Sequence, residues 1–406
     1  IAFRICFLGK CSVRHSKTYQ AIKVTQMLHT RLPLPAFRTI KNFIHGPNSI
    51  AALRGLECTR ATLVVGKSLT RQTKLFDKLK RNIRCQHLDV IEKSWTGEPS
   101  LADLKKPMQQ LEKNCADVII AVGGGSIMDA AKLMWMFYEH PDLDRSLYTR
   151  AFAIPSLRGR TRFVCVPTTT GTGSEVSSSA LFLDEETGRK ISVVTHDFLP
   201  DVAILDPEFV ENMPTSVMIA TVCDALSHAI EGYVSRLDNP LMDVMAEKAV
   251  QMIFENWQVA LEGGDVRLNA LSNLQYAATM AGWVQNHKLA GASHAIAHQL
   301  ANFGVPHGNA NAILLPSVIR FNARDEQTAR KFERLSHLCG VGQAPEDLAC
   351  AVETIRQSGG FDLRLSTYGK FDRSWVAAHA LEDPTAPFNP VTLVEETVLG
   401  ILEACQ

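Results

Sequence analysis

The sequence predicts an α/β nucleotide-binding domain followed by an all-helical domain. Short apolar runs alternate with amphipathic stretches from residue 40 to about residue 207, which is typical of βαβ units and a parallel sheet. Two loops rich in glycine or threonine follow such runs. Beyond residue 207, long helical periodicity replaces the strand-like runs. The expected divisions are an N-terminal extension at 1–35, the α/β domain at 36–208 and the helical domain at 209–406.

The individual elements follow from the length and periodicity of the apolar runs. Buried parallel strands are predicted at residues 61–65 (ATLVV), 118–122 (VIIAV) and 163–166 (FVCV). Helices are predicted between them at 69–83 and 126–139, and a hairpin at 178–192. In the second half, long helices are predicted at 216–235, 240–263 and 266–289.

Composition excludes several classes of protein. Lys+Arg and Asp+Glu both number 42, so no net charge favours nucleic acid or a membrane surface. We find no apolar stretch of the ~18–20 residues that a bilayer requires. Ten cysteines without a C-x-x-C pair are typical of reduced thiols in a cytoplasmic protein.

The first 56 residues contain nine Lys or Arg and no Asp or Glu. A mitochondrial transit peptide has this composition, which makes the mitochondrial matrix the alternative location. A disordered tail or a translation that starts upstream of the true start would also explain it. The chain begins with Ile1 rather than Met, which fits a fragment or an extended gene model.

A run of three glycines, Gly123-Gly124-Gly125, follows the predicted strand at 118–122 and leads through Ser126 into the predicted helix. Glycine lets the backbone approach a phosphate closely, and the free N–H groups and dipole of a helix start favour an anion. A tight strand-to-helix turn needs fewer glycines than this. We interpret the run as a phosphate-binding loop.

A second polar loop, PTTTGTGSEV at 167–176, also follows a predicted strand. Its hydroxyl groups and flexible backbone suit ribose, pyrophosphate or carboxamide groups, whereas a solvated polar loop is the alternative. Because the carboxyl ends of parallel strands meet at one edge of a sheet, the two loops indicate one shared ligand crevice.

The end of the first predicted strand bears on the choice of cofactor. An acidic residue there usually binds the ribose 2′-hydroxyl of NAD. Here Gly66 occupies that position and Lys67 follows. With no carboxylate to repel a 2′-phosphate, the sequence favours NADP(H) or tolerance of both cofactors. The alternative is that Lys67 is only a solvated surface charge.

Carboxylate and imidazole side chains in the helical half predict a metal site. Asp224 and His228 are four residues apart and share one helical face. Four histidines then fall within 21 residues, namely His287, His294, His298 and His307. At the chain's average of 13 histidines in 406 residues, such a window holds fewer than one. A mixed oxygen and nitrogen donor set without sulfur suits Fe²⁺, Zn²⁺ or Mn²⁺ and leaves room for a substrate oxygen.

At these residues the chain resembles the iron-containing (group III) alcohol dehydrogenases, from about residue 37 to residue 404. The motifs that carry the resemblance are GGGSIMDAAK at 123–132, PTTTGTGSEVS at 167–177, DALSHAIEGY at 224–233, GASHAIAHQLANFGVPHGNANAILLP at 291–316 and DPTAPFNP at 383–390. The resemblance implies a dinucleotide-binding α/β domain and a helical domain, an architecture shared with dehydroquinate synthase, in a homodimer or larger homo-oligomer.

The resemblance also assigns residues to roles. It implies metal ligands at Asp224, His228, His294 and His307, with Fe²⁺ expected and Zn²⁺ or Mn²⁺ as alternatives. It implies a proton-relay role for His298. It implies cofactor contacts by residues of both loops and beyond, namely Gly124, Gly125, Ser126, Thr168, Thr169, Thr172, Ser177, Ser179 and Lys190.

Three departures from the family pattern remove no metal ligand. Many members have aspartate where Gly66 stands, which again favours NADP(H). The segment between His298 and His307 is one residue shorter than in several branches. Ala301 replaces a frequent glycine, and Val222-Cys223 replaces the usual residues before Asp224.

The expected reaction is reversible hydride transfer between a small alcohol and nicotinamide, with a metal that lowers the pKa of the alcohol. His298 is expected to shuttle the proton, with a fifth-ligand or purely packed role as alternatives. Three rival functions stay open: a metal-independent reductase like maleylacetate reductase, a hydroxyacid-oxoacid transhydrogenase, and a metal hydrolase. We expect no nucleic-acid or membrane partner.

Overall fold

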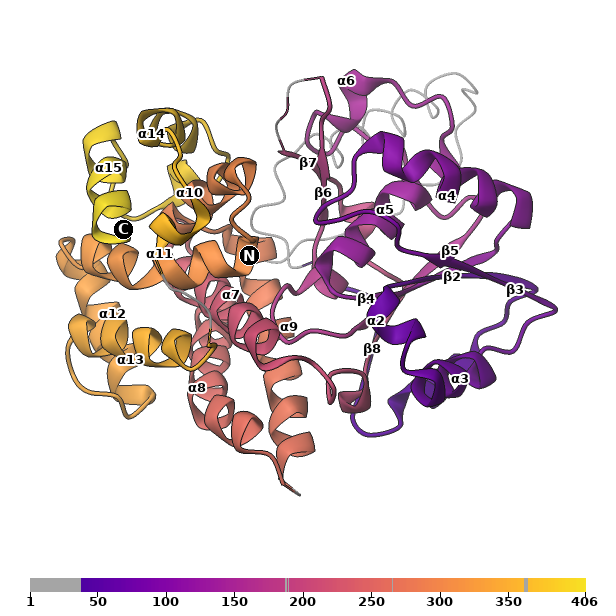
Figure 1. Cartoon of the computed structure of the whole chain (residues 1–406), viewed down its shortest axis with the longest axis horizontal. Coiled ribbons are helices and arrows are strands. Elements are labelled where there is room, and N and C mark those ends of the chain that lie inside the picture. The colour runs from indigo at the N-terminus through magenta and orange to yellow at the C-terminus, as the bar shows by residue number, and fades with distance from the viewer. Residues whose placement is uncertain (1–37, 187, 189, 265, 361–363) are drawn as a thin grey trace, which may run out of the picture.

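The computed structural model describes residues 38–406 except 187, 189, 265 and 361–363, so the predicted extension at 1–35 lies outside the described residues. The α/β part and the helical part lie side by side, on the right and left of Figure 1. The predicted fold class is confirmed, because the parallel sheet comes first and no strand occurs among the described residues beyond Leu205.

Six parallel strands form the main sheet, in the order β1-β8-β5-β4-β2-β3. The strands are β1 (Asn42–His45), β2 (Arg60–Val65), β3 (His87–Glu92), β4 (Val118–Gly123), β5 (Arg162–Pro167) and β8 (Val202–Leu205). The three predicted strands match β2, β4 and β5 to within one residue. Since all six strands run in the same direction, their carboxyl ends lie on the same side of the sheet. Open α/β sheets bind ligands beyond these strand ends.

Helices cover both faces of this sheet (Figure 1). Ile119 and Ala121 of β4 pack in one core with α4 (Leu101–Asn114) and α5 (Gly125–Glu139). Ile120 and Val122 pack in another with α3 (Thr73–Asn82) and the 3-10 helix η1 (Ser49–Gly55). Burial on both faces explains why the strand sequence is continuously apolar rather than alternating.

The single helix predicted over residues 69–83 is wrong, because two helices occupy this stretch: α2 (Lys67–Thr70) and α3. Gln72 leaves the helical backbone conformation with a ψ of 71°. No apolar residue lies between Leu69 and Leu75. Side chains in that gap therefore gain nothing from burial that would hold one continuous helix against the sheet.

The predicted hairpin is confirmed. Strands β6 (Ser179–Leu183) and β7 (Lys190–Val194) pair in antiparallel fashion and form a separate two-stranded sheet. Helix α6 (Arg145–Tyr148) lies near them, where Arg145 forms an ion pair of 2.7 Å with Asp184 in the turn. Strand β6 begins shortly after the threonine-rich loop at 167–176, so the hairpin anchors the C-terminal end of that loop.

The second part consists of helices. Those that bear on the site are α7 (Thr215–Val234), α8 (Pro240–Glu262), α9 (Arg267–Lys288), α10 (Ala292–Leu300) and α11 (His307–Asn322). The remainder are α12 (Glu326–Leu338), α13 (Pro345–Gln357), α14 (Arg373–Leu381) and α15 (Glu395–Ala404). The predicted helices at 216–235, 240–263 and 266–289 match α7, α8 and α9 to within one residue.

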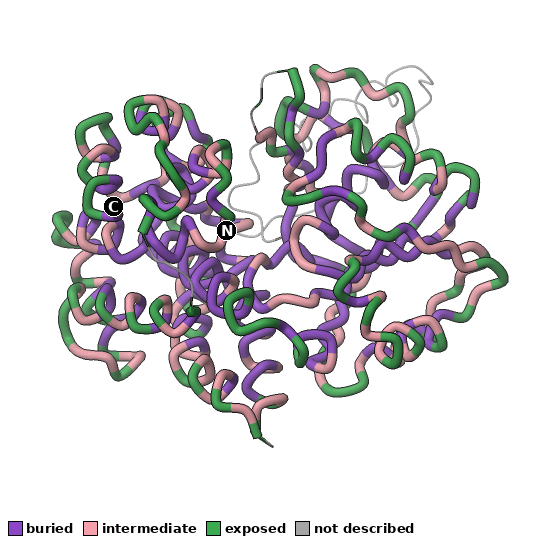
Figure 2. The backbone as a smooth tube through the Cα atoms, in the orientation of Figure 1, coloured by how far each residue is buried: buried purple, intermediate pink, exposed green. Residues whose placement is uncertain are grey.

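Helix α7 forms the centre of the helical part. By length and composition it passes a test for a membrane span, which the sequence analysis did not anticipate, but 89% of the apolar window is buried inside the protein. Figure 2 shows the middle of the helical part as largely buried. The helix is long and apolar because it is surrounded by other helices, and this burial draws Asp224 and His228 into the interior.

Candidate active site

The four predicted metal ligands come from three helices. Asp224 and His228 lie one turn apart in α7, His294 lies in α10, and His307 is the first residue of α11. All four predicted ligands therefore come together, although they are far apart in the sequence. Asp224, His228 and His294 are at most 3% exposed, whereas the His307 side chain is 24% exposed and forms the open side of the cluster.

The ligand atoms converge closely. Asp224 Oδ1 lies 4.0 Å from Nε2 of His228, 3.8 Å from Nε2 of His294 and 3.3 Å from Nε2 of His307. A tetrahedral ion with bonds of about 2.1 Å spaces its ligand atoms roughly 3.4 Å apart. The separations from Asp224 Oδ1 are near this value. The ligand atoms of Asp224, His228 and His294 also lie within 4.8 Å of one another, so these three residues fit a divalent metal ion, and His307 approaches the group at Asp224 Oδ1.

Burial also sets the protonation of these groups. Desolvation lowers the pKa of His228 to about 3 and also lowers the pKa of His307, so both rings are neutral at pH 7. Burial alone would raise the pKa of Asp224, but the neighbouring imidazoles, chiefly His228 and His307, hold it below its usual range. Asp224 is thus an ionised carboxylate in the interior, a buried negative charge that a divalent cation would compensate.

Glu231, which the sequence analysis did not single out, orients His294. Its Oε2 accepts a hydrogen bond of 2.6 Å from His294 Nδ1, which leaves Nε2 to face the metal position. Burial lowers the pKa of His294, but the hydrogen bond and charge of Glu231 outweigh it and raise the pKa. The same carboxylate accepts from the backbone N–H of Ser293, at 2.5 Å, and so caps the start of α10.

Asn311, one turn after His307 in α11, was also missed. Its Nδ2 donates to Asp224 Oδ1 at 2.8 Å and lies 3.3 Å and 3.2 Å from Nε2 of His294 and His307. Its Oδ1 accepts from Ser293 Oγ at 3.0 Å, which fixes the direction of the amide. The NH₂ group of Asn311 thus lies beside three acceptor atoms, one from Asp224 and one from each of His294 and His307.

His298 lies beside the cluster without joining its closest contacts. Its ring stacks on that of His307, with centroids 5.4 Å apart and an interplanar angle of 13°. Its Nδ1 contacts Asp383 Oδ2 at 2.9 Å, and the side chain is 23% exposed. Asp383 was missed as a partner, although it begins the motif DPTAPFNP. The ring is thus held at one nitrogen, and the other remains available to a proton donor or acceptor.

The glycine and threonine loops pack against each other. Gly124 caps α5, and a Cβ placed there would lie 3.0 Å from Thr169 Cγ2. A Cβ on Gly125 would lie 3.1 Å from Thr172 Cγ2. The two loops therefore pack against each other at the start of α5, and the ligand crevice that they share stays a prediction. Thr169 Oγ1 is buried there with no hydrogen-bond partner among the described residues, which fits a cofactor that supplies one.

The remaining predicted cofactor residues lie around the same edge. Gly66 caps α2 and Lys67 begins it, and a Cβ on Gly66 would lie 3.7 Å from Ile127 Cδ1 of α5. Thr168 follows β5, and its N–H donates to the carbonyl of Gly123 at 3.0 Å. The ends of β2, β4 and β5 thus bring these predicted residues side by side.

Ser177, Ser179 and Lys190 already have partners in the protein. The carbonyl oxygens of Ser177 and Ser179 each accept from the buried Lys132 Nζ at 2.9 Å, and their hydroxyls bond each other at 2.9 Å. Lys190 Nζ forms an ion pair of 2.7 Å with Glu98. Their contacts with the cofactor stay predictions from the resemblance.

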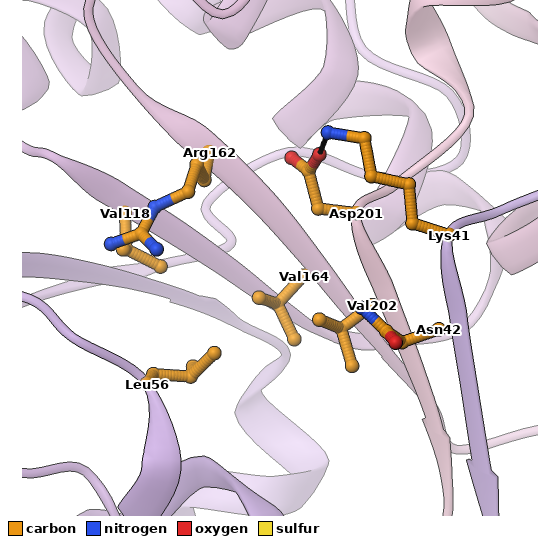
Figure 3. Close-up of a pocket in the computed structure, with 8 residues that line it drawn as sticks. All are labelled: Lys41, Asn42, Leu56, Val118, Arg162, Val164, Asp201 and Val202. Atoms are coloured by element: carbon orange, nitrogen blue, oxygen red, sulfur yellow. Dashed lines mark hydrogen bonds and ion pairs between the residues drawn. The ribbon is translucent and has the colours of Figure 1, made fainter.

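A hollow of about 240 Å³ lies at the opposite ends of the strands from the two loops (Figure 3). Asn42, Val118 and Val202, which line it, are the first residues of β1, β4 and β8. The hollow is therefore at the amino ends of the strands, whereas the glycine and threonine loops follow their carboxyl ends.

Family comparisons match both parts of the chain. The model described as "Iron-containing alcohol dehydrogenase" matches residues 41–207, and the model "Fe-containing alcohol dehydrogenase family, C-terminal" matches residues 218–406. The chain belongs to the iron-containing alcohol dehydrogenase family. It is accordingly an NAD(P)-linked alcohol dehydrogenase that uses a metal ion and a nicotinamide cofactor.

Relatives of this dehydrogenase include enzymes named for small alcohols. The NADPH-dependent butanol dehydrogenase of Clostridium saccharobutylicum is 31% identical over 378 residues, which cover 90% of this chain and 97% of that enzyme. The 1-propanol dehydrogenase of Citrobacter freundii is 35% identical over 72% of this chain and 75% of its own. The chain spans 49% of the length of aldehyde-alcohol dehydrogenase 2 of Entamoeba histolytica, at 34% identity over 98% of this chain.

Solved structures of the family share the fold of this dehydrogenase. A 1,3-propanediol oxidoreductase superposes with a TM-score of 0.82 at 28% identity, covering 91% of this chain and 99% of that one. The iron-containing alcohol dehydrogenase of Thermococcus thioreducens gives a TM-score of 0.81 at 28% identity, with the same coverage of both chains.

Proposed function

We propose that this dehydrogenase uses Fe²⁺ and NADP(H) to interconvert small primary alcohols and aldehydes. The observation that carries the proposal is the convergence of Asp224 Oδ1 with three imidazole Nε2 atoms at 3.3–4.0 Å. The proposed ligands are Asp224, His228, His294 and His307. When bound, the ion would act as a Lewis acid that stabilises negative charge on the oxygen of the alcohol.

The side chains around the ligands would hold the site ready for this chemistry. Glu231 keeps the His294 Nε2 lone pair directed at the metal position, and Asn311 holds the Asp224 carboxylate. The desolvation that lowers the pKa of His228 also keeps its ring free of a competing proton. The ligands are therefore arranged before the ion arrives, which lowers the cost of binding it.

His298 is the proposed proton relay. The contact between its Nδ1 and Asp383 supports this role, because the carboxylate orients the ring and stabilises the imidazolium that forms when the ring accepts a proton. Its partial exposure supports transfer of that proton to solvent. The alternative of a fifth ligand receives less support, since the histidines within 4.0 Å of Asp224 Oδ1 among the described residues are His228, His294 and His307.

The proposed preference for NADP(H) rests on the end of β2. Gly66 places no carboxylate at this position, and Lys67 adds a positive charge beside it. The butanol dehydrogenase relative is named as NADPH-dependent, which supports the same direction. The proposed pyrophosphate contacts are Gly124, Gly125 and Ser126, with Thr168, Thr169 and Thr172 on the facing loop.

A metal-independent reductase receives less support. Without a cation, this site would keep the ionised carboxylate of Asp224 buried in the protein interior, which is costly. Assembly into a homodimer or larger oligomer, and location in the cytoplasm or the mitochondrial matrix, stay predictions from the sequence. Light scattering of the purified protein tests the first of these.

The proposed function is tested with purified protein stripped of metal and reconstituted anaerobically with Fe²⁺, Zn²⁺ or Mn²⁺. A panel of aldehydes is then offered with NADPH or NADH, and the loss of nicotinamide absorbance is followed. We expect the highest activity with Fe²⁺ and NADPH. The Asp224→Asn variant should lose metal and activity, whereas Asp325→Asn, which alters only the cap of α12, should keep both. Full activity in the Asp224→Asn variant would contradict the proposal.

A further inference from the structure

Lys93 occupies an unusual position at the carboxyl edge of the sheet. It directly follows β3, and its backbone N–H donates to the carbonyl of Val65 at 2.9 Å. Val65 is the last residue of β2, so Gly66 is the next residue along that strand. The backbone of Lys93 is thus fixed beside the strand end that was predicted to meet the cofactor ribose.

The side chain of Lys93 reaches from there to the glycine loop. Its Nζ donates to Ser126 Oγ at 2.8 Å and to the carbonyl of Gly97 at 2.8 Å. Both of these partners are neutral. Burial lowers the pKa of Lys93, while the charges of Glu98 and Asp103 raise it. The ammonium group is therefore half-desolvated, and neither hydrogen bond gives it an anionic partner.

The electrostatics of α5 make this placement unfavourable in isolation. Ser126 is the second residue of α5, and the first turn of a helix presents unpaired N–H groups with partial positive charge. Cations are normally found at the other end of a helix. An ammonium group beside a helix start is explained if an anion binds between them, because it would interact favourably with both.

Two buried hydrogen-bond donors near Lys93 lack acceptors in the part of the chain that the structure describes, which also favours a bound anion. Lys93 Nζ lies 5.6 Å from the centre of the Trp95 ring, and Trp95 is 8% exposed. The buried Trp95 Nε1 has no acceptor among the described residues. Neither does the hydroxyl of Thr169, which packs on Gly124. Buried donors usually have acceptors, so a ligand rich in acceptor oxygens beside Gly124 would supply the one that the Thr169 hydroxyl lacks.

We propose that Lys93 binds a phosphate group of the nicotinamide cofactor, in concert with Ser126 and the start of α5. A phosphate supplies both the negative charge and the acceptor oxygens that these groups lack. The inference rests on the proposed function, since it requires the dinucleotide to bind at this edge. The phosphate is either the pyrophosphate, common to NAD and NADP, or the 2′-phosphate of NADP.

The test is equilibrium binding of NADPH and NADH to the metal-loaded enzyme, followed by nicotinamide fluorescence. We expect Lys93→Met to raise the Kd for NADPH roughly 10-fold or more, because a charge-assisted hydrogen bond is lost. Lys93→Arg should retain most of the affinity. Lys105→Met, which removes an exposed lysine from nearby α4, is the matched control and should bind as the wild type does.

The two cofactors distinguish the sources of the phosphate. An equal loss for NADPH and NADH in Lys93→Met assigns Lys93 to the pyrophosphate, and a loss for NADPH alone assigns it to the 2′-phosphate. Unchanged binding of both cofactors would overturn the inference while leaving the proposed function intact. Wild-type protein that binds neither cofactor would instead refute the proposed function. If Lys93→Met fails to fold, Lys93→Gln, which keeps a hydrogen bond to Ser126, replaces it in the same comparison.

Discussion

Replacing Glu231 with glutamine perturbs the proposed metal site without touching a ligand. Glu231 is 2% exposed, and its two oxygens accept from His294 Nδ1 at 2.6 Å and from two backbone N–H groups, those of Ser293 and His294. Glutamine has the same shape but exchanges one acceptor oxygen for an NH₂ group. In Glu231→Gln the new NH₂ group must therefore face another N–H donor, either the backbone N–H of Ser293 at the start of α10 or the Nδ1–H of His294.

The size of the effect follows from these contacts. A buried donor left without an acceptor costs about 1–3 kcal/mol. Removing a hydrogen-bonding partner of a metal-bound histidine typically costs 10–100-fold in metal affinity, which corresponds to about 1.4–2.8 kcal/mol. The two estimates agree. We therefore expect the Kd for the divalent metal to rise 10- to 100-fold in Glu231→Gln.

Competition against a chelator of known affinity measures this Kd, and urea unfolding of the metal-free protein measures stability separately. Glu139→Gln is a matched control, because Glu139 also accepts from several backbone N–H groups, those of Gly159, Arg160 and Thr161, but in the α/β part. The control should lose stability without losing metal affinity. Wild-type metal affinity in Glu231→Gln would refute the reasoning that Glu231 orients His294.

Three further predictions concern the relay, the cofactor and the packing of the loops. His298→Gln should lower kcat by about 10²- to 10⁴-fold with unchanged metal content; an unaltered kcat would exclude the relay. In Gly66→Asp the new Cβ would lie 3.7 Å from Ile127, an ordinary contact distance, so the variant should fold. Fluorescence titrations should show that its binding preference shifts from NADPH towards NADH. An unchanged ratio of the two Kd values would contradict the 2′-phosphate argument. Gly282→Ala would place a Cβ 2.8 Å from Gly173 Cα, so urea unfolding should show that the free energy of unfolding falls by about 1–3 kcal/mol. Unchanged stability would show that the threonine loop moves to accommodate the Cβ.

The sequence was sufficient to predict elements and groupings that lie within one strand or one helix. The run VIIAV is apolar throughout because β4 is covered on both faces, and its composition alone reveals this. Asp224 and His228 share a face because the helical period of 3.6 residues fixes their relation. The clustering of histidines then indicated the other predicted ligands, and the resemblance selected among them.

Contacts between elements were not predictable in the same way. Glu231 lies seven residues after Asp224 on the same helix, yet its partner His294 is on another helix, and only the packing of α7 against α10 brings the two together. His298 and Asp383 are 85 residues apart, and Lys93 and Ser126 are 33 residues apart. The break at Gln72 also escaped prediction, because it arises from the absence of a buried anchor rather than from a strong helix-breaking residue.

The central claim is that a divalent ion held by Asp224, His228, His294 and His307 drives hydride transfer between an alcohol and NADP. The most direct measurement is alcohol-dependent reduction of NADP⁺ by one protein sample before chelation, after chelation and after Fe²⁺ is restored. We predict that activity disappears with the metal and returns when one equivalent of Fe²⁺ per chain is bound. Undiminished activity in protein shown by elemental analysis to be free of metal would contradict the account.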